Sequence, residues 1–227
     1  MAGMAQAASL VIDPVRIEFA NRRPYATLRL TNQGDSPITV QARVFRWGFK
    51  GEEDVLVPSD EVILNPPLLT IEPHAERILR LGLRVPNNSS AEQTYRLILD
   101  EIPKAQAESQ VSAVNVVLRI SIPIFAKPKG NAAPRLAWTA RALADGKVEI
   151  SAVNSGSAHV QIKQLTISKA GAQAAAVTQT THTYLLPKQQ HKWEIARAEK
   201  TGATQLVVHA VTDAGDINET LDLPPDN

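Results

Sequence analysis

Short runs in which apolar and polar residues alternate recur along the whole chain. In residues 26–32 and 38–45, aliphatic side chains alternate with threonine, arginine and glutamine, and a Gly-Asp-Ser-Pro turn at 34–37 separates the two runs. Such alternation is typical of half-buried β-strands. Further runs in the first half of the chain lie at 10–19, 62–64, 68–71, 77–85, 95–100 and 111–125. About seven or eight strands are therefore expected, enough for one immunoglobulin-like sandwich.

Residues 127–134 interrupt this pattern with two prolines, one glycine and no large apolar side chain, which is typical of a linker. A second set of strand-like runs follows at 136–140, 148–154, 160–168, 184–186, 192–195, 205–211 and 220–223. Residues 170–181 lack a clear period and are expected to form a loop or short edge strands. The sequence thus predicts an all-β protein with sandwich domains at 9–126 and 135–227, and it shows no repeat strong enough to indicate duplication.

The first eight residues belong to neither domain. Ala5-Gln6-Ala7 resembles the A-x-A site that ends a secretory leader, although the basic segment and the apolar core of a leader are missing. We interpret residues 1–8 either as a leader remnant or as a disordered, alanine-rich start.

Composition excludes several classes of function. The 227 residues carry 24 Lys and Arg against 23 Asp and Glu, a formal net charge of +1 with no basic block, so nothing indicates a nucleic-acid or anionic-membrane partner. No apolar run reaches the roughly 18 residues that a transmembrane helix needs. The chain has no cysteine. Disulfides, thiolate nucleophiles and cysteine-ligated metals are therefore excluded.

Residue patterns that could support catalysis or metal binding are also missing. The five histidines, at 74, 159, 182, 191 and 209, have neither H-x-H nor H-E-x-x-H spacing. Glu52-Glu53-Asp54 lacks the alternating oxygen ligands of a calcium loop and is expected at a hairpin tip. No G-x-S-x-G, phosphate loop or dinucleotide motif occurs. We therefore expect no enzyme, cofactor, metal or small-molecule substrate, and we expect the three tryptophans to pack in or beside the cores.

The run at 111–125 is unusually long and apolar. Six aliphatic residues occupy its even positions without interruption: Val114, Val116, Leu118, Ile120, Ile122 and Ile124. Fifteen extended residues span roughly 50 Å, which is more than one small sandwich covers easily. Pro123 cannot donate to a ladder, so at least that part of the run is expected at an edge or a bulge. Two interpretations stay open: either all six residues fill the protein's own core, or another protein completes part of the stripe.

Several stretches, in order, resemble periplasmic pilus-assembly chaperones of the chaperone–usher pathway. They are I-D-P-V-R-I-E-F (12–19), L-R-L-T-N (28–32), N-P-P-L-L-T-I-E-P (65–73), R-I-L-R-L (77–81), Y-R-L-I-L-D-E-I-P (95–103) and I-P-I-F-A-K-P (122–128). The resemblance covers nearly the whole chain. The missing cysteines and the I-P-I-F ending favour the archaic or alternative branch, which serves spore-coat-like and biofilm pili.

The resemblance implies a periplasmic protein with two immunoglobulin-like domains set in an L or boomerang. It also implies that the protein catalyses no chemical reaction. Such a chaperone lends its long strand to a pilus subunit that lacks one, and then passes the subunit to an outer-membrane usher. The donated residues here would be Val114, Val116 and Leu118, with Ile120 as a further candidate, while Ile122 and Ile124 stay in the core. When free, the chaperone would leave the front of the stripe uncovered or cover it by self-association. The alternative, a tandem-sandwich surface or adhesive module, would bury all six positions.

The resemblance also implies basic residues that grip the subunit's C-terminal carboxylate. Arg16 matches the arginine of the family's first strand, but the usual lysine position falls on Pro123, which cannot serve. Arg96 alternates with Ile98 and Asp100 and should point away from the first domain's interior. We therefore predict Arg96 as the main carboxylate anchor and Arg16 as the secondary one.

A last set of positions matches the ionic cluster with which the family holds its domain angle. The matching residues are Glu92, Lys127 and Asp213. Exposed ion pairs contribute only about 0–1 kcal/mol, so this trio is predicted to orient the domains rather than to stabilise them.

Overall fold

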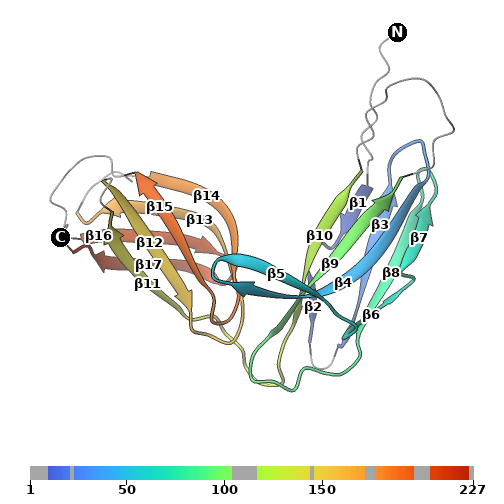
Figure 1. The fold of residues 1–227 in the computed structure, drawn as a ribbon, viewed down its shortest axis with the longest axis horizontal. Helices are drawn as coiled ribbons and strands as arrows, with labels where there is room; N and C mark the ends of the chain where they lie inside the picture. Colours follow the sequence, from blue (N-terminus) through green and yellow to red (C-terminus); the bar gives the residue numbers. More distant parts are fainter. Residues whose placement is uncertain are drawn as a thin grey trace, which may run out of the picture. The chain divides into compact units, whose positions relative to one another are not determined.

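A computed structural model describes residues 10–20, 23–103, 117–143, 146–171, 177–196 and 205–224. These residues form strands joined by turns and contain no helix, which confirms the predicted all-β class. They divide into two compact units, each built from facing sheets (Figure 1). The first unit comprises residues 1–48, 55–89 and 93–129, and the second comprises residues 49–54, 90–92 and 130–227.

Two sheets form the first unit. One has the order β1 (Leu10–Asp13), β3 (Tyr25–Asn32), β8 (Glu76–Leu83), β6 (Val62–Asn65). The other has the order β2 (Ile17–Phe19), β10 (Arg119–Ala126), β9 (Gln93–Ile102), β4 (Ile38–Lys50), β5 (Glu53–Pro58), and β7 (Leu68–Ile71) also pairs with β4. The β2–β10 pair is parallel, whereas β9 runs antiparallel to both β10 and β4.

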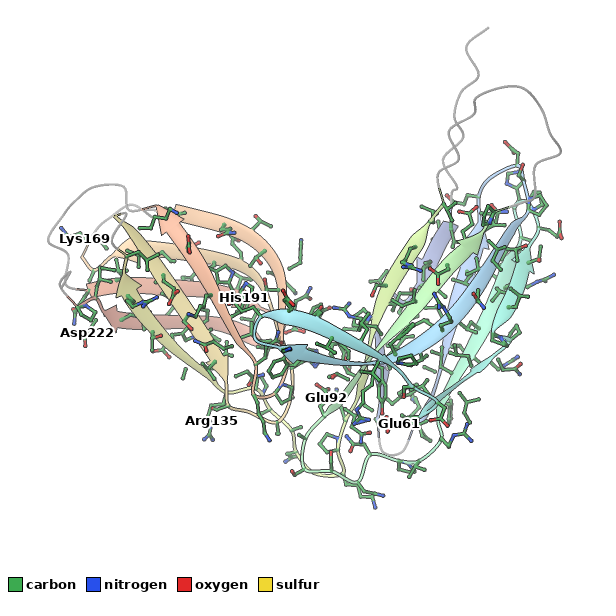
Figure 2. The ribbon with its side chains drawn as sticks, viewed as in Figure 1. Glu61, Glu92, Arg135, Lys169, His191 and Asp222 are labelled. Carbon is green, nitrogen blue, oxygen red and sulfur yellow. The ribbon has the colours of Figure 1, made fainter. Side chains whose placement is uncertain are left out.

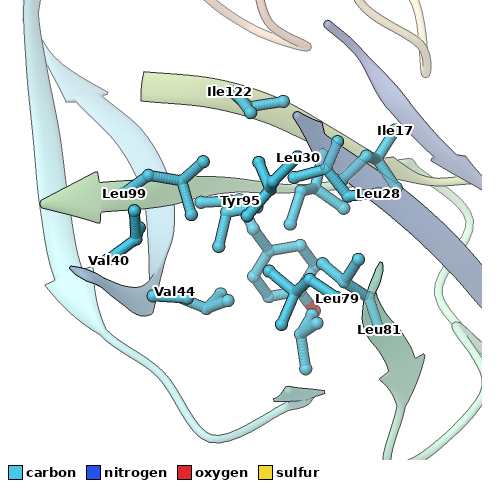
Figure 3. Packing of buried hydrophobic residues seen from close by; sticks show 14 of the residues in the cluster. Ile17, Leu28, Leu30, Val40, Val44, Leu79, Leu81, Tyr95, Leu99 and Ile122 are labelled. Carbon is cyan, nitrogen blue, oxygen red and sulfur yellow. The ribbon is translucent and has the colours of Figure 1, made fainter. Parts of the chain in front are cut away.

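Alternating side chains from both sheets make the core of the first unit. Leu28 and Leu79 from one sheet and Tyr95 and Leu97 from the other are fully buried. Figure 3 shows the Tyr95 ring among aliphatic side chains of the two sheets. Burying each such side chain contributes roughly 1.5–3 kcal/mol, which explains why the alternating runs of the sequence form these strands.

The second unit also has two sheets. The first contains β11 (Leu136–Ala142), β12 (Lys147–Asn154) and β15 (Gln190–Ala196) in that order. The second has the order β14 (Val177–Leu185), β13 (Val160–Lys169), β16 (Gln205–Thr212), β17 (Gly215–Asp222). Trp138 and Trp193 stack in the core with ring centroids 5.8 Å apart. Together with the buried Trp47, they confirm that the tryptophans serve packing.

The structure differs from the sequence-based strand predictions in three places. The run at 10–19 is divided into β1 and β2, because Pro14 lies between them and cannot donate to a ladder. β5 was missed because all six of its residues are exposed, so its sequence shows no burial period. Residues 177–181, from the stretch expected as a loop or short edge strands, do lie in an edge strand, because β14 pairs only with β13 among the described strands. That strand is longer than expected, since it continues to Leu185.

Each unit contains a buried asparagine that closes one corner of the sandwich. Asn32, the last residue of β3, donates through Nδ2 to the carbonyl oxygens of Ser36 (2.8 Å) and Ile71 (3.1 Å). Its Oδ1 accepts a hydrogen bond from the amide of Gly34 (2.9 Å). This one side chain therefore ties the turn after β3 to the end of β7.

The second unit repeats this corner with the same spacing. Asn154 ends β12 and donates to the carbonyl oxygens of Ala158 (2.8 Å) and Leu185 (3.0 Å), while its Oδ1 accepts from the amide of Gly156 (3.0 Å). The only sequence signal is a short N-x-G, which was too weak to indicate a repeat. We call these two sites the asparagine corners.

Candidate functional site

The first half of β10 is paired on one side only. β10 pairs with β9 over Arg119–Ala126, whereas its parallel pairing with β2 covers only Ile124–Ala126. Among the described residues, no strand pairs with the other side of residues 119–123. We call this side the open edge.

The ladder geometry shows which backbone groups face the open edge. The amide of Glu101 donates to the carbonyl of Leu118 at 2.9 Å. Alternate residues of an antiparallel strand bond to the same neighbour, so Arg119, Ser121 and Pro123 direct their backbone groups away from β9. Pro123 has no N–H to offer there, and the edge position expected for it is confirmed.

Burial of the aliphatic stripe decreases along β10 towards its start. Ile124 and Ile122 are 0% and 2% exposed and belong to the core of the first unit, as predicted. Ile120 and Leu118 are only half-buried. Val114 and Val116 lie outside the described residues. Ile120 still packs against the core, whereas Leu118 is not part of that cluster, so the described part of the stripe leaves the core between these two residues.

Arg96 lies on the sheet face opposite the core, as predicted. It is the β9 partner of Pro123, and its neighbours Tyr95 and Leu97 are buried in the core. The Arg96 guanidinium carbon lies 3.6 Å from the centroid of the Trp47 ring, a cation–π contact. This contact places the guanidinium over the Trp47 ring, on the face of the sheet away from the core.

Arg16 directly precedes β2, next to the point where β2 begins to pair with β10. Its Nη2 lies 3.2 Å from Oε1 of Glu18, and Nζ of Lys127 lies 2.7 Å from the other oxygen of that carboxylate. One carboxylate thus lies between two cations. Arg16 and Arg96 belong to the two segments that flank Pro123 on either side.

Two members of the predicted ionic trio share a histidine that sequence reasoning did not assign to it. Oε2 of Glu92 (Figure 2) accepts a hydrogen bond from the amide of His159 (2.9 Å) and lies 2.6 Å from its Nδ1. Nε2 of His159 lies 3.8 Å from Asp213. Lys127 instead pairs with Glu18. A single histidine in the sequence does not indicate which acidic residues it will contact. The role of Glu92, Lys127 and Asp213 in setting the domain angle stays a prediction.

The described residues contain no group of three histidine or acidic side chains able to hold a metal ion. Nor does any helix in the described part of the chain have the length and apolar character to cross a membrane. Within the ranges that the structure describes, the open edge has unpaired backbone groups that can bind another strand, and Arg16 and Arg96 lie beside it.

Both halves of the chain match descriptions of one protein family. Residues 9–132 match "Pili and flagellar-assembly chaperone, PapD N-terminal domain", and residues 131–221 match "Pili assembly chaperone PapD, C-terminal domain". The chaperone protein FimB/FhaD of Bordetella pertussis is 26% identical over 226 residues, which cover 94% of this chain and 87% of the relative.

Solved structures show the same fold. A chain of the CsuC–CsuE chaperone–tip adhesion subunit complex, from archaic chaperone–usher pili of Acinetobacter baumannii, matches with a TM-score of 0.70 and 25% identity, covering 96% of this chain and 100% of that one. A chain of the Salmonella enterica SafA pilin–SafB chaperone complex matches with a TM-score of 0.65 and 15% identity, covering 95% and 98%. This chain, with both of its domains matched, belongs to the PapD family of pilus-assembly chaperones, which are not enzymes.

Proposed function

We propose that this chain is a periplasmic chaperone that stabilises pilus subunits by lending them a strand, and that it delivers them to an outer-membrane usher. The observation that carries the proposal is the open edge of β10, together with the aliphatic stripe that leaves the core there. Family membership and the structural match to archaic pili support a client of the pilus-subunit class, assembled through the archaic branch.

Strand addition explains what the open edge can bind. A subunit strand alongside residues 119–123 would gain main-chain hydrogen bonds, and alternate side chains of the donated segment would fill its unfinished core. Leu118 and the half-buried Ile120 are the described candidates, and Val114 and Val116 continue the stripe in the sequence. Each aliphatic side chain buried in the subunit would contribute roughly 1.5–3 kcal/mol.

The alternative of a surface or adhesive module is less consistent with the burial pattern. Such a module would bury the whole stripe within one chain, yet Leu118 and Ile120 are only half-buried. A free chaperone would cover these residues with a client, or with a second copy of itself before a client arrives.

Arg96 and Arg16 are the proposed anchors for the subunit's C-terminal carboxylate. Both lie beside Pro123, the family's usual lysine position, so they can supply the charge that proline lacks. Stacking on Trp47 holds the Arg96 guanidinium in place, whereas Arg16 already shares Glu18 with Lys127. We therefore assign the larger contribution to Arg96, through a charge-assisted hydrogen bond.

Co-expression with candidate pilus subunits encoded nearby, followed by a pull-down, tests the function. A client should accumulate in soluble form only when this chain is present, and Leu118→Asp should abolish its recovery because a charge cannot enter the subunit core. Val57→Asp is the matched control, because Val57 is 55% exposed on β5. Equal client yield from wild type and Leu118→Asp would contradict strand donation.

The same assay tests the anchor. We expect Arg96→Ala to lower client recovery about tenfold, which corresponds to the loss of about 1.4 kcal/mol from one charge-assisted contact. Arg29→Ala serves as the control, since Arg29 pairs with Glu76 on the exposed surface of the other sheet. Recovery at the wild-type level would remove Arg96 from this role.

A further inference from the structure

The last residues of β9 hold the start of β10 through side chains as well as backbone. The Glu101 amide donates to the Leu118 carbonyl at 2.9 Å. In a regular antiparallel pair the Leu118 amide would donate back to the Glu101 carbonyl. Here it donates to Oε2 of the Glu101 side chain at 3.2 Å. A carboxylate therefore takes over the ladder contact at the point where the donated segment would leave the sheet.

The neighbouring acid, Asp100, holds the next residue of the same segment. Its Oδ1 lies 2.5 Å from Nε of Arg119, and its Oδ2 lies 2.6 Å from Nη2 of Arg43 on β4. Burial alone would raise the pKa of Asp100, but the hydrogen bonds from Arg119 and Arg43 outweigh it and lower that pKa. Asp100 is thus an anion that links the first residue of β10 to β4.

We propose that Asp100 and Glu101 are positioning residues for strand donation, and we call the pair the β9 clamp. The inference rests on the proposed function. A slip of one residue would turn every side chain of the donated segment to the wrong face. Core packing and β2 fix the register of β10 from Ile122 onwards. Before that residue, the described backbone contacts of the segment are those with β9, and they end at these two residues. The clamp therefore sets which side chains of the stripe enter the subunit.

Hydrogen exchange of the free protein tests the contact without any client. Glu101→Ala should speed exchange of the Leu118 amide about tenfold, because one charge-assisted bond is lost. Glu101→Gln keeps an acceptor oxygen and should restore much of the protection. Glu53→Ala, on the exposed β5, is the control for loss of an acidic side chain. Equal exchange at Leu118 in Glu101→Ala and wild type would overturn the clamp.

Cross-linking to a client tests the positioning role itself. The chain has no cysteine, so Ser121→Cys introduces a single thiol that can be paired with cysteines scanned along a client strand. With the clamp intact, one client position should dominate. With Asp100→Ala and Glu101→Ala added, cross-links should spread at least threefold more widely to neighbouring positions, in a free chaperone that circular dichroism and a cooperative thermal transition show to be folded.

The outcomes separate the two proposals. A single cross-link position that persists without the clamp, in a chaperone that still captures its client, overturns the positioning role alone. If wild type captures no subunit, the proposed function fails and this inference fails with it. A cross-link pattern that broadens in the double variant and narrows again in Asp100→Asn with Glu101→Gln supports the clamp.

Discussion

Tyr95 shows how one buried hydroxyl ties three segments of the first unit together. Its ring is fully buried, and its hydroxyl donates to Oε2 of Glu61 at 2.8 Å (Figure 2 labels Glu61). Arg46 of β4 pairs with the same carboxylate and lies over the Tyr95 ring. Burial and then the hydrogen bond to Glu61 raise the pKa of Tyr95. The hydroxyl thus joins β9, β4 and the residue that precedes β6.

We expect Tyr95→Phe to lower the free energy of unfolding by about 1–2 kcal/mol at neutral pH, because Glu61 loses a donor. The raised pKa means that the folded protein keeps the Tyr95 proton above about pH 10, where the unfolded chain releases it. Wild-type stability should therefore fall as the pH rises beyond 10, and Tyr95→Phe should lack that part of the slope. Urea unfolding at pH 7 and pH 10.5 measures both effects, and identical slopes would contradict this assignment.

At the scale of elements, the asparagine corners look alike but differ in the space around their glycines. A Cβ on Gly34 would meet only Oδ1 of Asn32, at 3.4 Å. A Cβ on Gly156 would lie 2.3 Å from the carbonyl oxygen of Ala133 and 2.5 Å from the amide nitrogen of Arg135. The second corner therefore requires glycine because the backbone of another segment passes directly over it.

Replacing each of these glycines with alanine should give unequal losses of stability. We expect Gly156→Ala to cost about 3 kcal/mol, since backbone must move to admit the methyl group. Gly34→Ala should cost less than about 1 kcal/mol. Urea unfolding followed by tryptophan fluorescence reports both units, because Trp47 lies in the first unit and Trp138 and Trp193 in the second. Equal losses in the two variants would contradict this expectation, because they would show that the backbone of residues 133–135 can move away from Gly156 without a further loss of stability.

The strands that the sequence predicted well are those with one buried face. β3 and β16 show regular alternation of burial because every second side chain enters a core. β5 has no buried face, and β14 is largely polar, so neither has a hydrophobic period to detect. The asparagine corners depend on partners 31 to 39 residues away, which no local pattern reveals.

At the scale of the whole molecule, one strand is shared between the protein's own core and the proposed client. We expect Ile122→Ala to cost about 2–5 kcal/mol in unfolding free energy and Leu118→Ala less than about 1 kcal/mol, because only Ile122 is fully buried. Client recovery should show the opposite order among variants that stay folded. Urea unfolding and the pull-down measure the two effects, and a large stability loss in Leu118→Ala would place Leu118 in the core.

Sequence reasoning located this strand and its proline because both signals are local. Six aliphatic residues at alternate positions and a residue without an N–H can be seen without knowing any neighbour. The partners of charged groups could not be predicted in this way. His159 between Glu92 and Asp213, and the contacts of Asp100 and Glu101 with β10, depend on distances that only the folded chain establishes.

Pro123 limits how far a subunit strand can pair with β10 in the proposed strand donation. A subunit strand that pairs with β10 can accept hydrogen bonds from the N–H groups of Arg119 and Ser121. Pro123 has no N–H to donate, and from Ile124 onwards this side of β10 is already paired with β2. Pairing must stop there, whatever the subunit's own sequence. The chaperone would thus fix where the subunit strand ends, and that end lies beside the two arginines proposed to bind its C-terminal carboxylate.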